Sequence, residues 1–109
     1  MQQVPQDDKE RKAIPLYTGC IKYFPLALIE VAKISKKGND QHNPGQPLHW
    51  AREKSSDHLN SAQRHMVEAD TDIEHAAALA WRALANLQEL CENERQRSSQ
   101  GSDAEPEEG

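Results

Sequence analysis

The sequence contains only two cysteines, Cys20 and Cys91, which lie far apart in its 109 residues. Two distant cysteines do not form the disulfide framework of a small secreted protein, and no CxxC pair indicates a zinc site. No apolar run approaches the length of a membrane span, and residues 1–12 lack the pattern of a signal peptide. We therefore expect free thiols, no membrane partner and a location in the cytoplasm.

The chain also lacks an excess of basic residues over acidic ones. The formal net charge is −5, and residues 92–109 contain six acids and two arginines, which gives this segment a net charge of −4. The rest of the chain is thus close to neutral and lacks the basic face that nucleic-acid binding requires. An anionic substrate would have to bind through a metal ion or through a few placed cations.

Hydrophobic residues are scarce as well, at 36% of the chain. Most of this deficit lies at the polar ends. We therefore expect a flexible lead over residues 1–12, a helical domain over 13–93 and a disordered acidic tail over 94–109. A domain of about 80 residues is at the small end for a self-sufficient core, so we also expect a homo-oligomer.

The spacing of apolar residues predicts an all-α protein, and neither strand alternation nor an internal repeat is present. Pro25 suits the first position of a helix, and Gly38 suits the end of one. The pattern Thr71-x-x-Glu74 is typical of a capping box at a helix start. Three main helices are expected, over residues 25–38, from about Ala51 or Lys54 to Glu68, and over about 72–93.

Each predicted helix has an expected buried face. The first is apolar over a broad surface, which is typical of a buried helix. The apolar stripe of the second consists of Leu59, Ala62 and Met66. The segment 15–24 is expected to pack on the helices, and Trp81 is expected in the core. The apolar stripe of the third helix consists of Ile73, Ala76, Ala77, Ala80, Leu84, Leu87 and Cys91, widened by Ala83 and Leu90.

Acidic residues on the first two helices could carry chemistry. Glu30 lies between apolar neighbours, where an ionised carboxylate is costly unless it meets a cation or a metal. If the two helices pack antiparallel, Glu30 can face Asp57, and opposed oxygen ligands suit a hard divalent cation. The alternative is that Glu30 pairs with Lys33 and that the second helix simply exposes a solvated polar face. The cations available for substrate phosphates are Lys33, Lys54 and Arg64.

The histidines and tryptophans each have a structural interpretation beside a functional one. None of the five histidines belongs to an HExxH motif or to a closed zinc set, and each is more simply a hydrogen-bonding structural residue. Trp50 either stacks on a base or anchors the preceding loop to the helices, and anchoring is favoured. The sequence has no glycine-rich phosphate loop, no nucleophile elbow and no Cys–His couple.

Six fragments together resemble the phage dATP/dGTP diphosphohydrolase family, which is related to MazZ and to the MazG-like enzymes. The similarity extends over about residues 12–89, and it is the combination that is specific. The fragments are KYFP at 22–25, EVAKIS at 30–35, GNDQHNPGQPLHW at 38–50, KSSDHLN at 54–60, RH at 64–65 and AWRAL at 80–84.

This resemblance implies an all-α pyrophosphohydrolase that cleaves a purine deoxynucleoside triphosphate, dGTP or dATP, between the α and β phosphates. It further implies Mg²⁺ or Mn²⁺ as cofactor and a dimer or tetramer with sites at subunit contacts. For a phage-encoded protein, the compartment is the host cytoplasm. The MazG-like class carries E-E-x-x-E on one helix and E-x-x-D on the next, whereas here Glu30 and Asp57 are the two clear carboxylates.

The loop 38–50 is expected to recognise the nucleotide and to close over it, with its glycines and prolines fixing its shape. Asp40 or His58 is expected to complete the metal ligands. The competing hypothesis is a non-catalytic helical module that binds a nucleotide or a host protein. The full set of candidates is Glu30, Asp57 and Lys54 as catalytic residues, Lys33, Asn39, His42, Trp50, Asn60, Arg64 and His65 for substrate, and Glu30, Asp57, Asp40 and His58 for metal.

Overall fold

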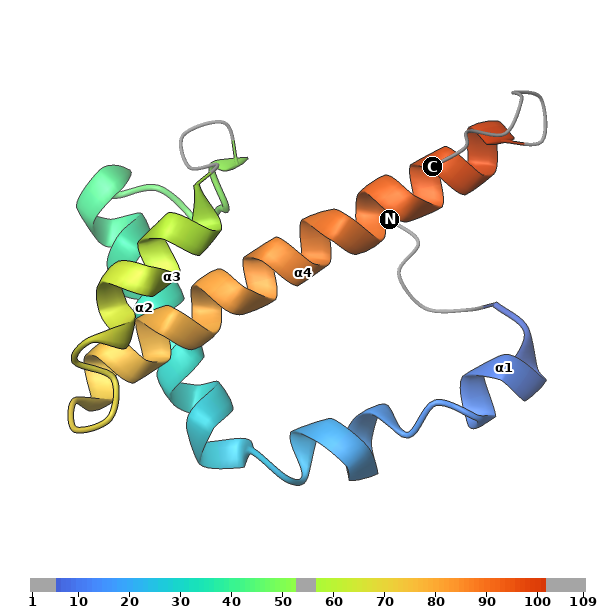
Figure 1. The fold of residues 1–109 in the computed structure, drawn as a ribbon, viewed down its shortest axis with the longest axis horizontal. Helices are drawn as coiled ribbons and strands as arrows, with labels where there is room; N and C mark the ends of the chain where they lie inside the picture. Colours follow the sequence, from blue (N-terminus) through green and yellow to red (C-terminus); the bar gives the residue numbers. More distant parts are fainter. Residues whose placement is uncertain (1–5, 53–56, 102–109) are drawn as a thin grey trace.

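The fold is organised around one long helix, α4 (Ile73–Gly101). Helices α2 (Pro25–His42) and α3 (His58–Met66) both pack against it, near its N-terminal end (Figure 1). The computed structural model describes residues 6–52 and 57–101, and within these ranges every regular element is helical. The predicted all-α class is therefore confirmed.

A short arm precedes this group of helices. It contains helix α1 (Asp8–Lys12) and a single π-helical turn, η1 (Tyr17–Ile21), and it runs away from α2 beneath α4 (Figure 1). The flexible lead expected over residues 1–12 thus includes a helical turn, which Asp7 caps by accepting a hydrogen bond from the Glu10 N–H at 3.0 Å. The expected packing of residues 15–24 on the helices is wrong for its large apolar side chains, since Tyr17 and Tyr23 are 61% and 70% exposed.

Helix α2 does not end at Gly38, contrary to the sequence prediction. Gly38 lies inside the helix, and the positive φ expected at a glycine cap occurs instead at Gly45, at 80°. A glycine inside a helix costs only about 1 kcal/mol. The Lys36–Asp40 ion pair, at 2.8 Å and one turn apart, and the buried Asn39 both favour the continued helix. The first residues of the predicted loop are therefore helical.

Helix α3 is shorter than predicted and turns a different face inward. Ala51 is not helical, Lys54 lies outside the described residues, and the helix begins at His58. Leu59 and Met66 of the expected apolar stripe are 65% and 57% exposed, so that stripe is wrong except at Ala62. The residues buried on α3 are His58, Ser61 and Ala62.

Small side chains are buried on both α3 and α4, which pack against each other. Ser61 and Ala62 are buried on α3, and Ala77 and Ala85 are buried on α4. Small residues let two helix backbones approach closely, because side-chain size sets the distance between helix axes. Among the described residues, the buried apolar side chains are three alanines, each 4–6% exposed, so most of the apolar surface remains outside.

Helix α4 begins and ends differently from the prediction. Asp72, not Thr71, caps it, because the Asp72 Oδ1 accepts a hydrogen bond from the Glu74 N–H at 3.0 Å. The helix then continues to Gly101, past residue 94 where a disordered tail was predicted. The extension is rich in Glu, Gln and Arg, which are good helix formers, and Arg97 pairs with Glu94 one turn away at 3.4 Å.

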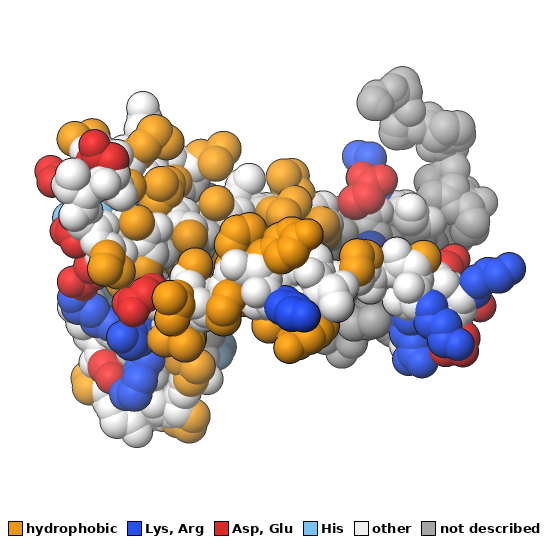
Figure 2. Space-filling model, turned by 90° about the horizontal axis from the view of Figure 1, so that it is seen from below, with side chains coloured by type: hydrophobic (Ala, Val, Ile, Leu, Met, Phe, Trp, Pro, Cys, Tyr) orange, Lys and Arg blue, Asp and Glu red, His pale blue; other side chains and the backbone are white. Residues whose placement is uncertain are grey.

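Large hydrophobic side chains cover much of the surface. Leu26 and Ile29 on α2 are 78% and 52% exposed, so the interpretation of this helix as buried is wrong within one chain. Figure 2 shows hydrophobic side chains gathered along the middle of one face. In the described part of the chain, no single helix is long and apolar enough to span a membrane. The segments Asp8–Ile21 and Pro25–His42 meet this length and apolarity only when they are taken together, and the chain bends by 86° between them.

Candidate functional site

The loop after α2 is fixed by one buried side chain. Asn39 is only 6% exposed, its Nδ2 donates to the Gln46 carbonyl at 3.1 Å, and its Oδ1 accepts from the His49 N–H at 3.2 Å. Both ends of the amide are therefore used by the loop backbone. Asn39 therefore has a structural role, which holds residues 46–49 over the end of α2, beside the substrate-binding role predicted for it.

Three aromatic rings anchor the end of this loop. Trp50 meets Trp81 edge to face, with ring centroids 5.6 Å apart, and His58 lies about as close to both, at 6.2 and 6.1 Å. Such edge-to-face pairs are favourable beyond the area that they bury. The anchoring interpretation of Trp50 is thus confirmed. Trp81, expected in the core, is half-buried within this cluster.

An ion pair joins Arg52, two residues after Trp50, to Glu92 in the distal part of α4. The Arg52 guanidinium lies 3.9 Å from the centroid of the Trp50 ring, and its Nη2 bonds the Glu92 Oε2 at 3.2 Å. The bond to Glu92 raises the pKa of Arg52, and the bond from Arg52, followed by one from Gln88, lowers the pKa of Glu92. The loop is therefore fastened to α4 by a charged contact as well as by aromatic rings.

His58 is a buried link between α3 and α4. It is 3% exposed, and its Nδ1 lies 3.0 Å from the Arg82 Nη1. Because a guanidinium only donates, His58 Nδ1 accepts this hydrogen bond. The buried Nε2 lies 3.3 Å from Glu89 Oε1 but does not form a hydrogen bond with it. The role as a metal ligand does not fit His58.

A cavity of about 830 Å³ lies between α2, the loop, α3 and α4. Two tryptophans, Trp50 and Trp81, form part of its wall, and charged side chains of both signs surround them. Five of the predicted site residues line it: Asn39, His42, Trp50, Asp57 and His65. The wall also includes charged and aromatic residues that were not among the predicted candidates, such as Lys37, Asp72, Glu74, His75, Trp81 and Arg82.

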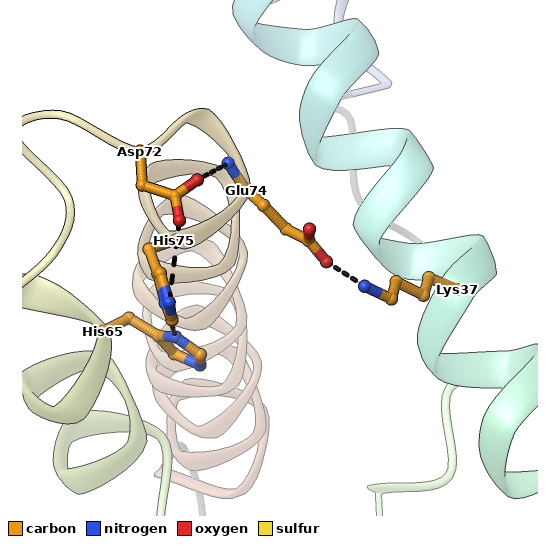
Figure 3. A network of polar contacts seen from close by, with 5 residues as sticks. All are labelled: Lys37, His65, Asp72, Glu74 and His75. Atoms are coloured by element: carbon orange, nitrogen blue, oxygen red, sulfur yellow. Dashed lines mark hydrogen bonds and ion pairs between the residues drawn. The ribbon is translucent and has the colours of Figure 1, made fainter.

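A polar network crosses one side of this cavity (Figure 3). Lys37 of α2 forms an ion pair with Glu74 of α4. The His75 Nε2 lies 3.7 Å from the Asp72 Oδ2, and its Nδ1 lies 3.0 Å from the Nδ1 of His65 on α3. The network therefore joins all three helices at the cavity, through residues far apart in sequence.

The environment of His65 favours its neutral form. Burial lowers the pKa of His65, and the nearby His75, Arg82 and Arg64 lower it further because they oppose a second positive charge. A neutral His65 can accept the hydrogen bond at Nδ1 when His75 donates it. On the other side of His75, its Nε2 faces the Asp72 carboxylate, which favours a proton on that nitrogen.

Several predicted residues lie away from the cavity. Glu30 pairs with Lys33 at 3.1 Å, which is the structural alternative that the sequence left open. Asp40 pairs with Lys36, and neither it nor Glu30 lines the cavity. Asn60 and Arg64 are exposed on α3 and do not line it either. Lys54 lies outside the described residues.

The donors expected to hold Mg²⁺ or Mn²⁺ do not come together within one chain. Asp57 lines the cavity without Glu30, and its nearest charged partner is Arg64, at 3.8 Å. Among residues 6–52 and 57–101, no three His, Cys, Asp or Glu side chains are grouped to hold a metal ion. Within a single chain, these residues therefore do not fit the divalent cation that the resemblance implies.

Part of the missed network had a signal in the sequence. An aspartate directly before a helix is a common cap, which would have pointed to Asp72. The capping-box pattern did select Glu74, but its side chain reaches across to Lys37 rather than back to the cap. No sequence signal pairs His65 with His75, because a turn of unknown geometry separates α3 from α4.

Searches of protein families, curated proteins and solved structures gave no match to this chain.

Proposed function

We propose that this chain binds a purine deoxynucleoside triphosphate, dGTP or dATP, in the cavity between α2, α3 and α4. One observation carries the proposal: Asn39 and His42 of α2, Trp50 of the loop, and Asp57 and His65 of α3 and its cap all line this cavity. Its volume of about 830 Å³ falls in the range of ligand pockets. Aromatic rings beside positive side chains suit a ligand that combines a base with phosphates.

The reaction that we propose is hydrolysis between the α and β phosphates. Water adds to phosphorus, the bond from phosphorus to the bridging oxygen breaks, and the products are the monophosphate and pyrophosphate. Of the predicted catalytic residues that the structure describes, only Asp57 lines the cavity, so Asp57 is the candidate to accept the proton of the water. Lys37 is the candidate to bind a phosphate, in exchange for Glu74.

Two further parts of the proposal rest on the resemblance rather than on a site in one chain. The first is dependence on Mg²⁺ or Mn²⁺ in the cytoplasm of a phage host. The second is assembly into a dimer or tetramer, which the exposed Leu26, Ile29, Leu84, Leu87 and Leu90 support. Large exposed apolar surface is typical of interaction sites. In an assembly, Glu30 of one copy can contribute to the site of another.

A turnover screen tests the proposed reaction. Purified protein is incubated with each common dNTP and NTP in the presence of Mg²⁺ or Mn²⁺, and the products are separated. Monophosphate and pyrophosphate from dGTP or dATP are expected. Diphosphate and phosphate would overturn the α–β cleavage, and the absence of any product with folded protein would overturn the enzymatic proposal.

Two substitutions test the catalytic assignment. Asp57→Ala is expected to abolish turnover because it removes the carboxylate at the cavity, and Glu30→Ala is expected to do so if the site is completed between copies. Asp8→Ala, in the exposed arm, is the control for loss of an acid elsewhere. Full activity in the folded Asp57→Ala protein would contradict the role of Asp57.

The second candidate function is a helical module that binds a nucleotide or a host protein without cleaving it. The pairing of Glu30 with Lys33 favours this candidate, because it leaves the acids of the predicted metal site apart. Product formation, rather than nucleotide binding, separates the two functions. An enzyme should also be stabilised by a dNTP in a metal-dependent way, since a ligand that binds the native state raises its stability.

A further inference from the structure

Two histidines of the cavity wall are joined by a hydrogen bond. The Nδ1 atoms of His65 on α3 and His75 on α4 are 3.0 Å apart, and the centroids of the two rings are 5.2 Å apart (Figure 3). Both nitrogens thus point almost along the line that joins the rings, which is the geometry of an N–H···N hydrogen bond. One Nδ1 must therefore carry a proton, while the other presents a lone pair.

Asp72 determines which ring donates when the pair is neutral. Its Oδ2 lies 3.7 Å from the Nε2 of His75, and its Oδ1 accepts a hydrogen bond from the Glu74 N–H. The carboxylate favours a proton on the Nε2 of His75, and a neutral imidazole carries only one proton. His75 then accepts at Nδ1 and His65 donates from Nδ1. The second nitrogen of His65, its Nε2, is left with a lone pair.

The wall of the cavity offers little positive charge to an anionic ligand. Among the described residues that line it, the charged side chains are Lys37 and Arg82 against Asp57, Asp72 and Glu74. Lys37 is already paired with Glu74. Four histidines also line the cavity, and they are His42, His49, His65 and His75. The histidines are therefore the groups of the wall that can supply further positive charge by binding a proton.

A bound anion changes the balance at His65. Burial, followed by the nearby His75, Arg82 and Arg64, lowers the pKa of His65, which keeps the pair neutral without a ligand. A phosphate group in the cavity adds negative charge nearby and favours the protonated form. The hydrogen bond to His75 then lets the positive charge lie beside Asp72 rather than beside the two arginines.

We propose that the His65–His75 pair takes up one proton from solvent when a phosphate-bearing anion binds in the cavity, and that the protonated pair is part of the anion site. The inference rests on the proposed function, which places the triphosphate in this cavity. An N–H bond forms at the Nε2 of His65, the N–H bond at its Nδ1 breaks, and that proton binds the Nδ1 of His75. The pair gains one proton and one positive charge. The Nε2 of His65 changes from an acceptor, which an anion avoids, into a donor.

Calorimetry of the full chain measures this proton. A dGTP analogue with a methylene group between the α and β phosphates is titrated with Mg²⁺ at about pH 7.5, in two buffers of different ionisation enthalpy. We expect uptake of about one proton for each bound analogue, and an affinity that falls up to about tenfold when the pH is raised by one unit. His65→Gln and His75→Gln should bind without this uptake. Asp72→Asn, which can still cap α4, should reduce it.

The matched control is His49→Gln, which changes another histidine of the same wall and should keep the uptake. Binding without proton uptake by the wild-type protein would overturn this inference and leave the proposed function intact, whereas absence of binding would overturn both. Uptake that persists in His65→Gln, or that is lost in His49→Gln, would also overturn it.

Where a variant does not fold, nitrogen-15 NMR of the imidazole rings in the wild-type protein decides. Without ligand at about pH 7.5, the proton is expected on the Nδ1 of His65 and on the Nε2 of His75. Addition of the analogue should protonate both nitrogens of His75. A proton on the Nε2 of His65 before the analogue is added, or an unchanged His75 afterwards, would overturn the proposal.

Discussion

A single amide determines where the loop lies. Asn39 is buried and donates to and accepts from the loop backbone, and Trp50 and Arg52 then hold the end of the same loop. The position of the cavity wall depends on this side chain, because His49 and Trp50 follow directly. Residues of the cavity wall are thus placed by an amide that binds the loop backbone through both its nitrogen and its oxygen.

Asn39→Ala should therefore destabilise the protein by about 1–2 kcal/mol, because two hydrogen bonds are lost and the backbone groups must find water. The measurement is urea unfolding followed by circular dichroism. Gln41→Ala is the control, since Gln41 is exposed on the same helix, and it should change the stability by less than about 0.5 kcal/mol. Equal effects of the two substitutions would contradict the structural role of Asn39.

His65 gives the stability a dependence on pH. Burial first, and then His75, Arg82 and Arg64, lower the pKa of His65 in the folded state. The unfolded chain therefore binds a proton more readily, and folding is opposed once that proton is bound. The contribution of neutral His65 to the free energy of unfolding is complete above the usual histidine pKa of about 6.5. It is lost as the pH falls below that value toward the lower pKa that His65 has in the folded protein.

The expected result is that wild-type stability decreases between pH 7.5 and 5, and that His65→Gln reduces this decrease. Urea unfolding at several pH values measures it. His42→Gln, which changes an exposed histidine of the same cavity, should keep the wild-type slope. An unchanged slope in His65→Gln would show that other groups cause the pH dependence.

Among the elements, α2 is longer than predicted, and a substitution at Gly38 tests whether the helix continues through this residue. Gly38 lies inside the helix without a positive φ, and a Cβ added there meets no atom within 4 Å. Gly38→Ala should stabilise the protein by about 0.4–1 kcal/mol, because alanine restricts the unfolded chain and favours the helix. Thermal unfolding measures the change.

Gly45→Ala is the opposite case. Gly45 has φ at 80°, which strains a residue with a Cβ even though the space around it is open. This substitution should destabilise the loop. If Gly38→Ala were destabilising and Gly45→Ala neutral, the helix would end at Gly38, as the sequence alone predicts.

The helices were predictable where their patterns are local. Pro25 marked the start of α2, and the apolar repeat located the N-terminal part of α4, since caps and spacing act within one element. The buried face of α3 was not predictable in the same way, because His58 points inward to meet Trp50 and Trp81 from other elements. Tertiary contacts overrode the apolar stripe of Leu59 and Met66.

The candidate site, too, was predictable from sequence only in part. Sequence fragments selected Asn39, His42, Trp50, Asp57 and His65, which the fold brings to one cavity. They did not separate a ligand-binding amide from one that holds a loop, since both look alike in sequence. The neighbours His75 and Asp72 depend on the turn between α3 and α4, whose geometry no local pattern specifies.

For the molecule as a whole, the burial pattern favours association. Among the apolar residues described, only three alanines are buried, whereas Leu84, Leu87 and Leu90 on α4 are about half exposed. Their spacing of three residues keeps them on one face of the helix. A second copy of the chain is the partner that we propose for this face.

Leu84→Glu combined with Leu87→Glu should shift the protein from an oligomer toward single chains, because it places charges in an apolar contact. Sedimentation velocity over a range of concentrations measures the change. Gln63→Glu with Gln96→Glu adds the same charge at exposed polar positions and should leave the oligomer intact. An unchanged mass distribution in the leucine variant would place the contact elsewhere.

The edge-to-face pair of Trp50 and Trp81 has a spectroscopic consequence. These are the only two tryptophans of the chain, and both belong to the junction between the loop and the helices. Intrinsic fluorescence will therefore respond to the docking of the loop and to the contents of the cavity before it responds to loss of helix. Fluorescence and far-ultraviolet circular dichroism, recorded on one sample, will separate opening of the loop from unfolding of the bundle.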